Sequence, residues 1–247
     1  MRNHKLLIGL VVLTMTLIAA QATVFSSGGN QTRVIETRFT VRIENISDPS
    51  GQIASDGTKW PFALSPGFWV VHEKELSLFA QGKRAGTNGL EAQAEDGNSS
   101  GLVKALMTHH ASSQHGVFNM PVGETMPGPI GPGHVYQFSF TANPGMRLTV
   151  TTMFGQSNDL FYAPDKGGIS LFDEKGTPVS GDFTARIRLW DAGTEVNQEP
   201  GVGADQAPRQ KAPNTGMFEN KAINLVKDKY SYPKTNAVMR VTITPAM

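Results

Sequence analysis

The sequence predicts an all-β protein, an antiparallel β-sandwich with long loops and one or two short helices. Several segments alternate apolar and polar residues with a period of two, which is typical of strands with one buried face. Long connections separate these segments, and the 247 residues include 26 Gly and 15 Pro. Only short stretches fit an amphipathic helix, and the chain has no internal repeat. Together these features favour a sandwich over a helical or α/β fold.

The first 22 residues predict a secretory signal peptide. Arg2 and Lys5 form a positive start, residues 6–20 are apolar, and Ala20 and Ala22 provide a small-x-small cleavage site. The apolar run is too short to be a good membrane span. No Cys follows it, which excludes a lipoprotein anchor. An uncleaved N-terminal anchor is the alternative. Cleavage after Ala22 predicts a mature chain in the periplasm, at the cell surface or outside the cell.

Charge and cysteine content narrow the function classes. The chain has 22 Lys and Arg against 21 Asp and Glu, and loss of Arg2 and Lys5 leaves 20 against 21, a net charge of −1. A balance this close to neutral gives no electrostatic case for nucleic acid as a partner. The absence of cysteine suits an exported bacterial protein that uses no disulfides. Stability is then expected from packing, with a bound ion as a further source.

The first half of the mature chain predicts a leader, two strands and two short helices. Phe39, Val41 and Ile43 alternate with polar residues, which is the strand pattern. Pro61 and Pro66 place the second strand at an edge or a kink. In chain order we expect a flexible leader at 23–37, a single domain from 38 to 247, strands at 39–43 and 62–71, and helical turns at 89–95 and 102–107.

The second half predicts five more strands and two long loops. Tyr136, Phe138 and Phe140 share one face of a strand, and Pro144 and Gly145 then suggest a hairpin turn into the next strand. Proline and glycine mark the two loops. The expected elements are a loop at 112–133, a hairpin of strands 135–141 and 147–154, a short strand at 169–172, a strand at 182–189, a loop at 196–232 with a helical turn at 222–226, and a closing strand at 238–244.

Acidic residues follow two of these predicted strands. Asp159 comes shortly after strand 147–154, and Asp191 and Glu195 come directly after strand 182–189, with Gly193 between them to permit a tight turn. If the two strand ends meet, the three carboxylates converge, and they would repel one another strongly unless a cation lies among them. We therefore predict Asp159, Asp191 and Glu195 as metal ligands. The alternative is that Asp159 and Asp191 cap turns through their own side chains.

The same segments resemble a known family. Ser157–Phe161 and Trp190–Glu195 occur in the order found in the spondin N-terminal domain, which is known from the matrix protein F-spondin and from bacterial secreted proteins. Ser65–His72, Leu78–Gly82 and Gly89–Gly97 match further blocks in the family's order. Each block alone is weakly specific, but the ordered set covers about residues 39 to 213, most of the mature chain.

The resemblance implies a C2-like β-sandwich of about eight strands with one calcium ion at its end. The calcium-binding acids of the family match Asp159, Asp191 and Glu195. Two positions depart from the family's pattern, since Glu195 stands where an Asp is usual and Leu160 where an aromatic residue often follows the first acid. The eukaryotic members carry cysteines, which this chain lacks.

Histidines are weaker candidates for a site. His109, His110 and His115 could hold a transition metal with Glu95 or Asp96. Adjacent histidines point apart on a helix, so solvated loop histidines are the preferred interpretation. His72 lies in a strand, where a surface or hydrogen-bonded histidine is expected.

No catalytic motif is recognisable. The chain lacks Gly-x-Ser-x-Gly and His-Glu-x-x-His and has no Cys. Asp182 with Asp191, or Glu91 with Glu95, could be imagined as a glycosidase pair, but nothing singles either pair out. The three tryptophans, Trp60, Trp69 and Trp190, are assigned to the core.

The sequence thus predicts an exported, non-catalytic module that binds one Ca²⁺ and serves in adhesion or in binding a partner. The expected partner is an extracellular or cell-envelope protein or glycan, and membrane-surface contact has no specific support. The alternative is a secreted hydrolase that uses the same acidic loops, with a metal or with paired carboxylates.

Overall fold

A computed structural model describes residues 36–73, 76, 78–110 and 113–246. The predicted signal peptide and nearly all of the predicted leader lie outside the described residues. Within the described part of the chain, no helix combines the length and the apolar character needed to span a membrane.

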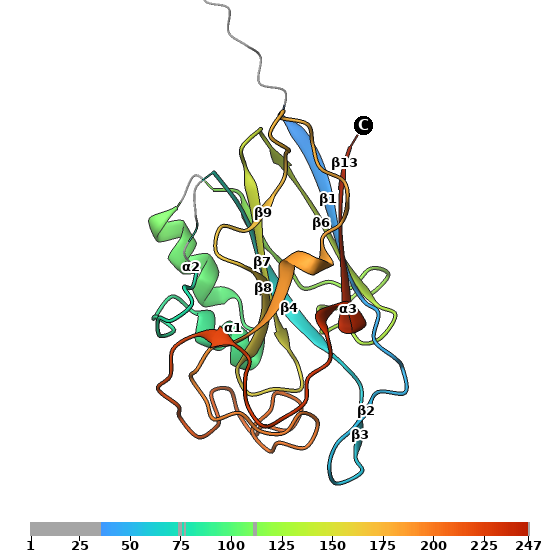
Figure 1. The fold of residues 1–247 in the computed structure, drawn as a ribbon, viewed down its shortest axis with the longest axis vertical. Helices are drawn as coiled ribbons and strands as arrows, with labels where there is room; N and C mark the ends of the chain where they lie inside the picture. Colours follow the sequence, from blue (N-terminus) through green and yellow to red (C-terminus); the bar gives the residue numbers. More distant parts are fainter. Residues whose placement is uncertain (1–35, 74–75, 77, 111–112, 247) are drawn as a thin grey trace, which may run out of the picture. The chain divides into compact units, whose positions relative to one another are not determined.

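Four strands form the smaller sheet, in the order β10-β13-β1-β6, with every neighbouring pair antiparallel (Figure 1). The central strand carries the predicted alternation, because Phe39, Val41 and Ile43 are buried and the residues between them are more exposed. The strands are β1 (Thr37–Asn45), β6 (Val135–Ala142), β10 (Gly181–Asp182) and β13 (Met239–Pro245).

The larger sheet runs β12-β11-β8-β7-β4-β5, with β9 paired to the end of β7. All of its pairs are antiparallel, so the two sheets confirm the predicted all-β class and the sandwich. A separate two-stranded hairpin consists of β2 (Gln52–Ile53) and β3 (Lys59–Trp60). The strands of the larger sheet are β4 (Leu64–His72), β5 (His115–Phe118), β7 (Arg147–Phe154), β8 (Leu160–Pro164), β9 (Ile169–Ser170), β11 (Ile187–Asp191) and β12 (Asn224–Leu225).

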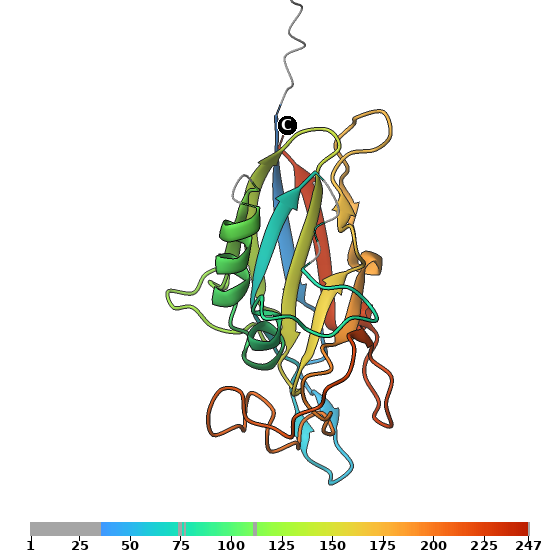
Figure 2. The same ribbon diagram turned by 90° about the vertical axis from the view of Figure 1, so that its left-hand side faces the viewer.

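The larger sheet is covered on both faces. One face packs against the smaller sheet, where Trp69 stacks on Phe138 with ring centroids 5.3 Å apart. On the other face lie α1 (Leu90–Asp96) and α2 (Ser100–His109), as Figure 2 shows. Leu90, Leu102 and Leu106 of these helices form a second apolar cluster with strand residues. This double cover explains why every residue of β8 is buried.

The tryptophans are core residues, as predicted. Trp60 and Trp190 are buried, and the partly buried Trp69 packs against the main core. The prediction of a hairpin from 135–141 and 147–154 was wrong, because β6 belongs to the smaller sheet and β7 to the larger. The Asn143-Pro144-Gly145 turn therefore carries the chain from one sheet to the other.

Other element boundaries also differ from the prediction. The strand expected at 182–189 is divided by a single 3₁₀ turn (Thr184–Arg186), so that β11 begins only at Ile187. The loops expected at 112–133 and 196–232 contain the short strands β5 and β12, and the second of these replaces the expected helical turn at 222–226. A short helix, α3 (Thr235–Val238), precedes the closing strand.

Candidate functional site

Two predicted acids meet at one end of the larger sheet. Asp159 immediately precedes β8, and Asp191 is the last residue of β11. These strands are antiparallel neighbours, with Leu160 opposite Asp191, so the start of one lies beside the end of the other. Asp159 thus lies beside the end of β11, but at the start of β8, a strand that the sequence did not predict and that separates β11 from β7.

Asp159 is a fully buried carboxylate that is only half satisfied. Its Oδ2 accepts hydrogen bonds from the Thr194 N–H at 2.8 Å, the Glu195 N–H at 3.1 Å and the Thr194 hydroxyl at 3.2 Å. Its Oδ1 has no hydrogen-bond partner among the described residues. Burial, and next the charge of Asp191, raise the pKa of Asp159 to about 7, against the lowering effect of the hydrogen bonds.

Asp191 closes the turn that follows β11. Its Oδ1 accepts the Gly193 N–H at 2.7 Å and its Oδ2 accepts the Asn197 side-chain amide at 2.7 Å. Gly193 has a φ of 69°, and a Cβ at this position would lie 2.8 Å from the backbone oxygen of Lys221, so the turn requires glycine. Turn capping, the alternative interpretation, therefore describes one function of Asp191. Burial raises its pKa, and the charges of Glu219 and Asp228 add to that effect.

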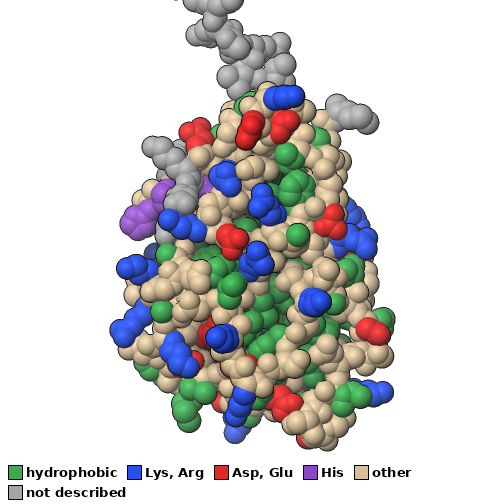
Figure 3. Space-filling model, viewed as in Figure 1, with side chains coloured by type: hydrophobic (Ala, Val, Ile, Leu, Met, Phe, Trp, Pro, Cys, Tyr) green, Lys and Arg blue, Asp and Glu red, His purple; other side chains and the backbone are tan. Residues whose placement is uncertain are grey.

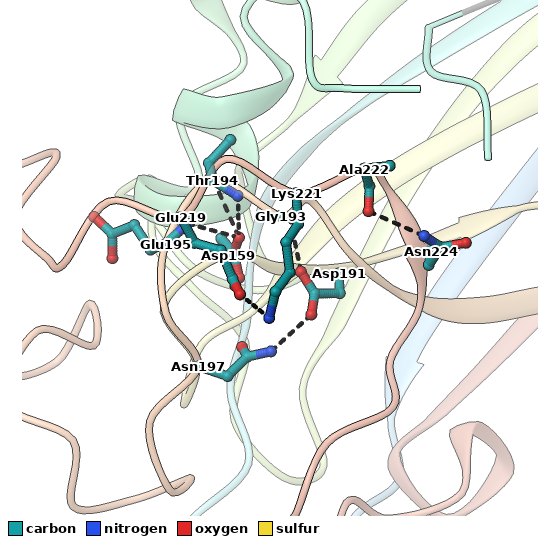
Figure 4. A network of polar contacts seen from close by, with 10 residues as sticks. All are labelled: Asp159, Asp191, Gly193, Thr194, Glu195, Asn197, Glu219, Lys221, Ala222 and Asn224. Carbon is teal, nitrogen blue, oxygen red and sulfur yellow. Dashed lines mark hydrogen bonds and ion pairs between the residues drawn. The ribbon is translucent and has the colours of Figure 1, made fainter. Parts of the chain in front are cut away.

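The Glu195 carboxylate points away from Asp159 and Asp191 (Figure 4). Its Oε2 accepts the Asn158 side-chain amide at 3.2 Å, and only its backbone N–H contacts Asp159. Burial raises the pKa of Glu195, and the charges that raise it further belong to Asp205, Asp96 and Glu91, on another side of the loop. The structure thus brings the side chains of Asp159 and Asp191 together and places that of Glu195 elsewhere.

Glu219 is a further carboxylate whose charge acts on Asp191. The segment around it crosses the 191–195 turn, since the Glu219 N–H donates to the Thr194 carbonyl at 2.7 Å and the Lys221 N–H donates to the Gly193 carbonyl at 2.9 Å. The Glu219 carboxylate pairs with Lys221, as Figure 4 shows, and its charge raises the pKa of Asp191. Nothing in the sequence marks Glu219, because it lies within a long irregular loop.

A lysine lies against this acidic group. The Lys221 ammonium forms an ion pair with Glu219, and the charges of Glu219, Asp191 and Asp159 raise its pKa. The Lys221 side chain is 73% exposed, so it can leave the group at little cost in packing. With all four groups ionised, three carboxylates face one ammonium, and a net negative charge remains.

No preformed metal cage is present in the part of the chain that the structure describes. No group of three or more His, Cys, Asp or Glu side chains there is arranged to hold a metal ion. His72 is buried and its Nε2 lies 3.0 Å from the Thr149 hydroxyl, which fits the expected hydrogen-bonded histidine. His109 and His110 are exposed at the end of α2, and His115 Nδ1 lies 2.9 Å from the Ser113 carbonyl oxygen.

A second buried carboxylate lies behind the first. Glu95 of α1 is only 2% exposed, and its Oε1 accepts the Thr194 hydroxyl at 2.7 Å. Its Oε2 has no partner among the described residues. Burial raises the pKa of Glu95 to about 8, and the charges of Glu195, Glu91 and Asp159 contribute. The sequence suggested Glu95 only as a partner for histidines or for Glu91, since a helical position gives no sign of contact with a distant loop.

Charges elsewhere do not form a basic patch on the face drawn in Figure 3, where Lys and Arg side chains are interspersed with Asp and Glu.

Comparison with known proteins adds no relationship, because no family model matches the chain and no curated protein is significantly similar to it. The spondin resemblance therefore rests on the motifs quoted above and stays a prediction.

Proposed function

We propose that this chain is an exported, non-catalytic β-sandwich module of the spondin type that binds one calcium ion at the Asp159 end of the larger sheet. One observation carries the proposal: Asp159 is fully buried, and its Oδ1 has no partner in the described structure. A buried carboxylate oxygen left without a partner is costly, and a bound cation is one means of removing that cost.

Calcium suits the donors at this position because it prefers several oxygen ligands from carboxylates and carbonyls. Asp159 and Asp191 would supply side-chain oxygens, and Glu219 would take the place that the family match gives to the Glu195 carboxylate. Lys221 would swing toward solvent as the ion enters. The role of Glu195 in this arrangement is its N–H, which fixes the orientation of Asp159.

The ion would stiffen loops that present a surface to a partner. Beside Asp191 lies an open groove of about 640 Å³, lined also by Asn197, Lys221, Asn224 and Asp228 among others. A partner at the cell surface or in the envelope, either a protein or a glycan, would contact this groove. Bound calcium would reduce the entropy that the loops lose on contact, which is how pre-organisation raises affinity.

Calcium titration by calorimetry tests the proposal. Protein produced from the full sequence should bind one calcium ion, and an Asp159→Asn variant should not, because the amide keeps the shape of the side chain but loses its charge. Asp165→Asn is the matched control, since Asp165 is exposed beyond the opposite end of β8. Absence of calcium binding by the unmodified protein, or equal binding by the Asp159→Asn variant, would refute the proposed site.

A hydrolase is the second candidate, and the raised pKa values of Glu95 and Asp159 favour it, because a general acid must hold its proton near neutral pH. Against it, both carboxyl groups are almost fully buried and share hydrogen bonds with Thr194. Turnover on panels of glycans and phosphoesters that is lost in an Asp191→Asn variant would favour the enzyme. No turnover together with calcium binding would favour the binding module.

A further inference from the structure

A pocket separate from the Asp191 groove lies against α1. Its volume is about 320 Å³, at the lower end of the range of small-ligand pockets, roughly 300–1,000 Å³. The segment before α1 and one face of the helix form most of the wall, and a residue from the long loop after β11 completes it. The lining residues are Gly86, Thr87, Gly89, Glu91, Ala92, Glu95, Asp96 and Asn214.

Glu95 distinguishes this pocket from an ordinary acidic surface. Glu95 is one of the lining residues, it is only 2% exposed, and its buried Oε2 finds no hydrogen-bond partner in the described chain. The Thr194 hydroxyl holds Oε1 at 2.7 Å and so fixes the carboxyl group in place. A buried polar atom without a partner beside a cavity indicates a missing donor, since buried oxygen atoms are normally hydrogen-bonded.

The charges around the pocket have one sign. Glu91 and Asp96 line it with Glu95, and no lining residue is Lys or Arg. Glu195 lies close enough for its charge to act on Glu95. Asp96 accepts a hydrogen bond from the Gln210 amide at 2.7 Å, which leaves its second oxygen for another donor. The pocket therefore favours a positively charged ligand.

We propose that this pocket binds a primary ammonium group on a short alkyl chain, the chemistry shared by a lysine side chain and a linear polyamine. An ammonium offers three donors, which match the Glu95, Glu91 and Asp96 carboxylates, and Ala92 with the neighbouring glycines can contact methylene groups. Ammonium binding at this site does not require a calcium ion at Asp159.

Ammonium binding should release a proton. Glu95 holds its proton up to about pH 8 because of its burial and because Glu195, Glu91 and Asp159 repel a charge there, so its pKa is about 8. The ligand requires the ionised carboxylate, so binding displaces the proton when the pH is lower. Affinity should then rise by about tenfold per pH unit between roughly pH 6 and pH 8 and level off above.

The test is calorimetric titration of protein produced from the full sequence with Nα-acetyl-lysine N-methylamide, with spermidine, and with the neutral Nε-acetylated lysine analogue. We expect the amines to bind with the stated pH dependence and the neutral analogue not to bind. The stronger of the two amines identifies the source of the ammonium group. Failure of both amines to bind across this pH range would overturn the proposal.

Glu95→Gln is the decisive variant, because the amide oxygen can still accept the Thr194 hydroxyl while the charge is removed. Amine affinity should fall roughly 10- to 100-fold and lose its pH dependence, with an unchanged or higher melting temperature. Asp96→Asn should weaken binding less and keep the pH dependence. Asp159→Asn, which removes the proposed calcium site, should retain amine binding, so the two proposals fail separately. Equal affinity and an unchanged pH profile in Glu95→Gln would contradict the assignment of Glu95.

Discussion

In the absence of calcium, the free energy of unfolding of this protein should fall as the pH rises from about 5 to about 8. The decrease should be smaller in an Asp159→Asn variant. The pKa of the Asp159 carboxyl rises from an ordinary 3.8 to about 7 in the folded chain. Between these pH values the folded state holds a proton that the unfolded state has released, so the free energy of unfolding decreases with pH. The contribution is present in full below about pH 4 and is lost above about pH 7.

The magnitude follows from the two pKa values. Ionising Asp159 in the folded state costs about 4 kcal/mol relative to the unfolded chain, of which about 2 kcal/mol falls between pH 5 and pH 7. Glu95 adds a further decrease that extends to about pH 8. Neither decrease coincides with the effect of Asp182, whose lowered pKa reduces stability only under more acidic conditions.

Urea unfolding monitored by tryptophan fluorescence, with a chelator present, measures the effect. In the unmodified protein, ionisation of Asp159 should lower the urea midpoint by about 1–2 M over this pH range. The Asp159→Asn variant should lack this decrease and show only the decrease due to Glu95. Asp165→Asn should behave like the unmodified protein. Stability that stays constant or rises between pH 5 and pH 8, or an identical decrease in Asp159→Asn, would refute the assigned burial of this charge.

Three further predictions concern the acidic group and the core. Lys221→Met should raise calcium affinity about fivefold in calorimetry by removing a competing cation, and weaker binding would contradict this. Gly67→Ala should destabilise by about 1–3 kcal/mol because the new Cβ would lie 2.2 Å from the Phe118 ring, whereas Gly128→Ala, where nothing lies within 4 Å, should be neutral in the same melt. Leu148→Ala, at a fully buried position, should lower the free energy of unfolding by about 2–5 kcal/mol. Leu225→Ala, at an exposed position, should lower it by less than about 0.5 kcal/mol.

The period-two pattern predicted strands well where each strand has one polar face. β1 and β13 alternate strictly, and both lie where the sequence placed them. β8 was missed because it is buried on both faces and carries no alternation. The error at 135–154 has a different origin, since a short Asn-Pro-Gly turn can join two strands of one sheet or carry the chain between two sheets. Only the packing of Phe138 and Phe140 against Trp69 of the opposite sheet decides between these.

At the acidic end of the sheet, the sequence could indicate only the positions of residues that adjoin strands. Asp159 and Asp191 adjoin paired strands, so their positions follow from the sheet. The direction of the Glu195 side chain depends instead on the segment that crosses the turn, with which Glu195 forms an isolated bridge at Phe218. The Thr194 hydroxyl faces Glu95 and Asp159, whereas the Glu195 carboxylate accepts a hydrogen bond from the Asn158 side-chain amide. That crossing segment also delivers Glu219, which no local pattern could indicate.

Thr194 connects the two buried carboxyl groups, and this has a consequence for both proposed sites. Its hydroxyl oxygen lies 2.7 Å from Glu95 Oε1 and 3.2 Å from Asp159 Oδ2, and its single hydrogen can be donated fully to only one of them. The charge of Asp159 also raises the pKa of Glu95. A cation bound at Asp159 would neutralise that charge and lower the pKa of Glu95, which makes the ionised form required by an ammonium ligand easier to reach. Because such coupling is reciprocal, an ammonium ligand at Glu95 would favour the cation at Asp159 by the same free energy.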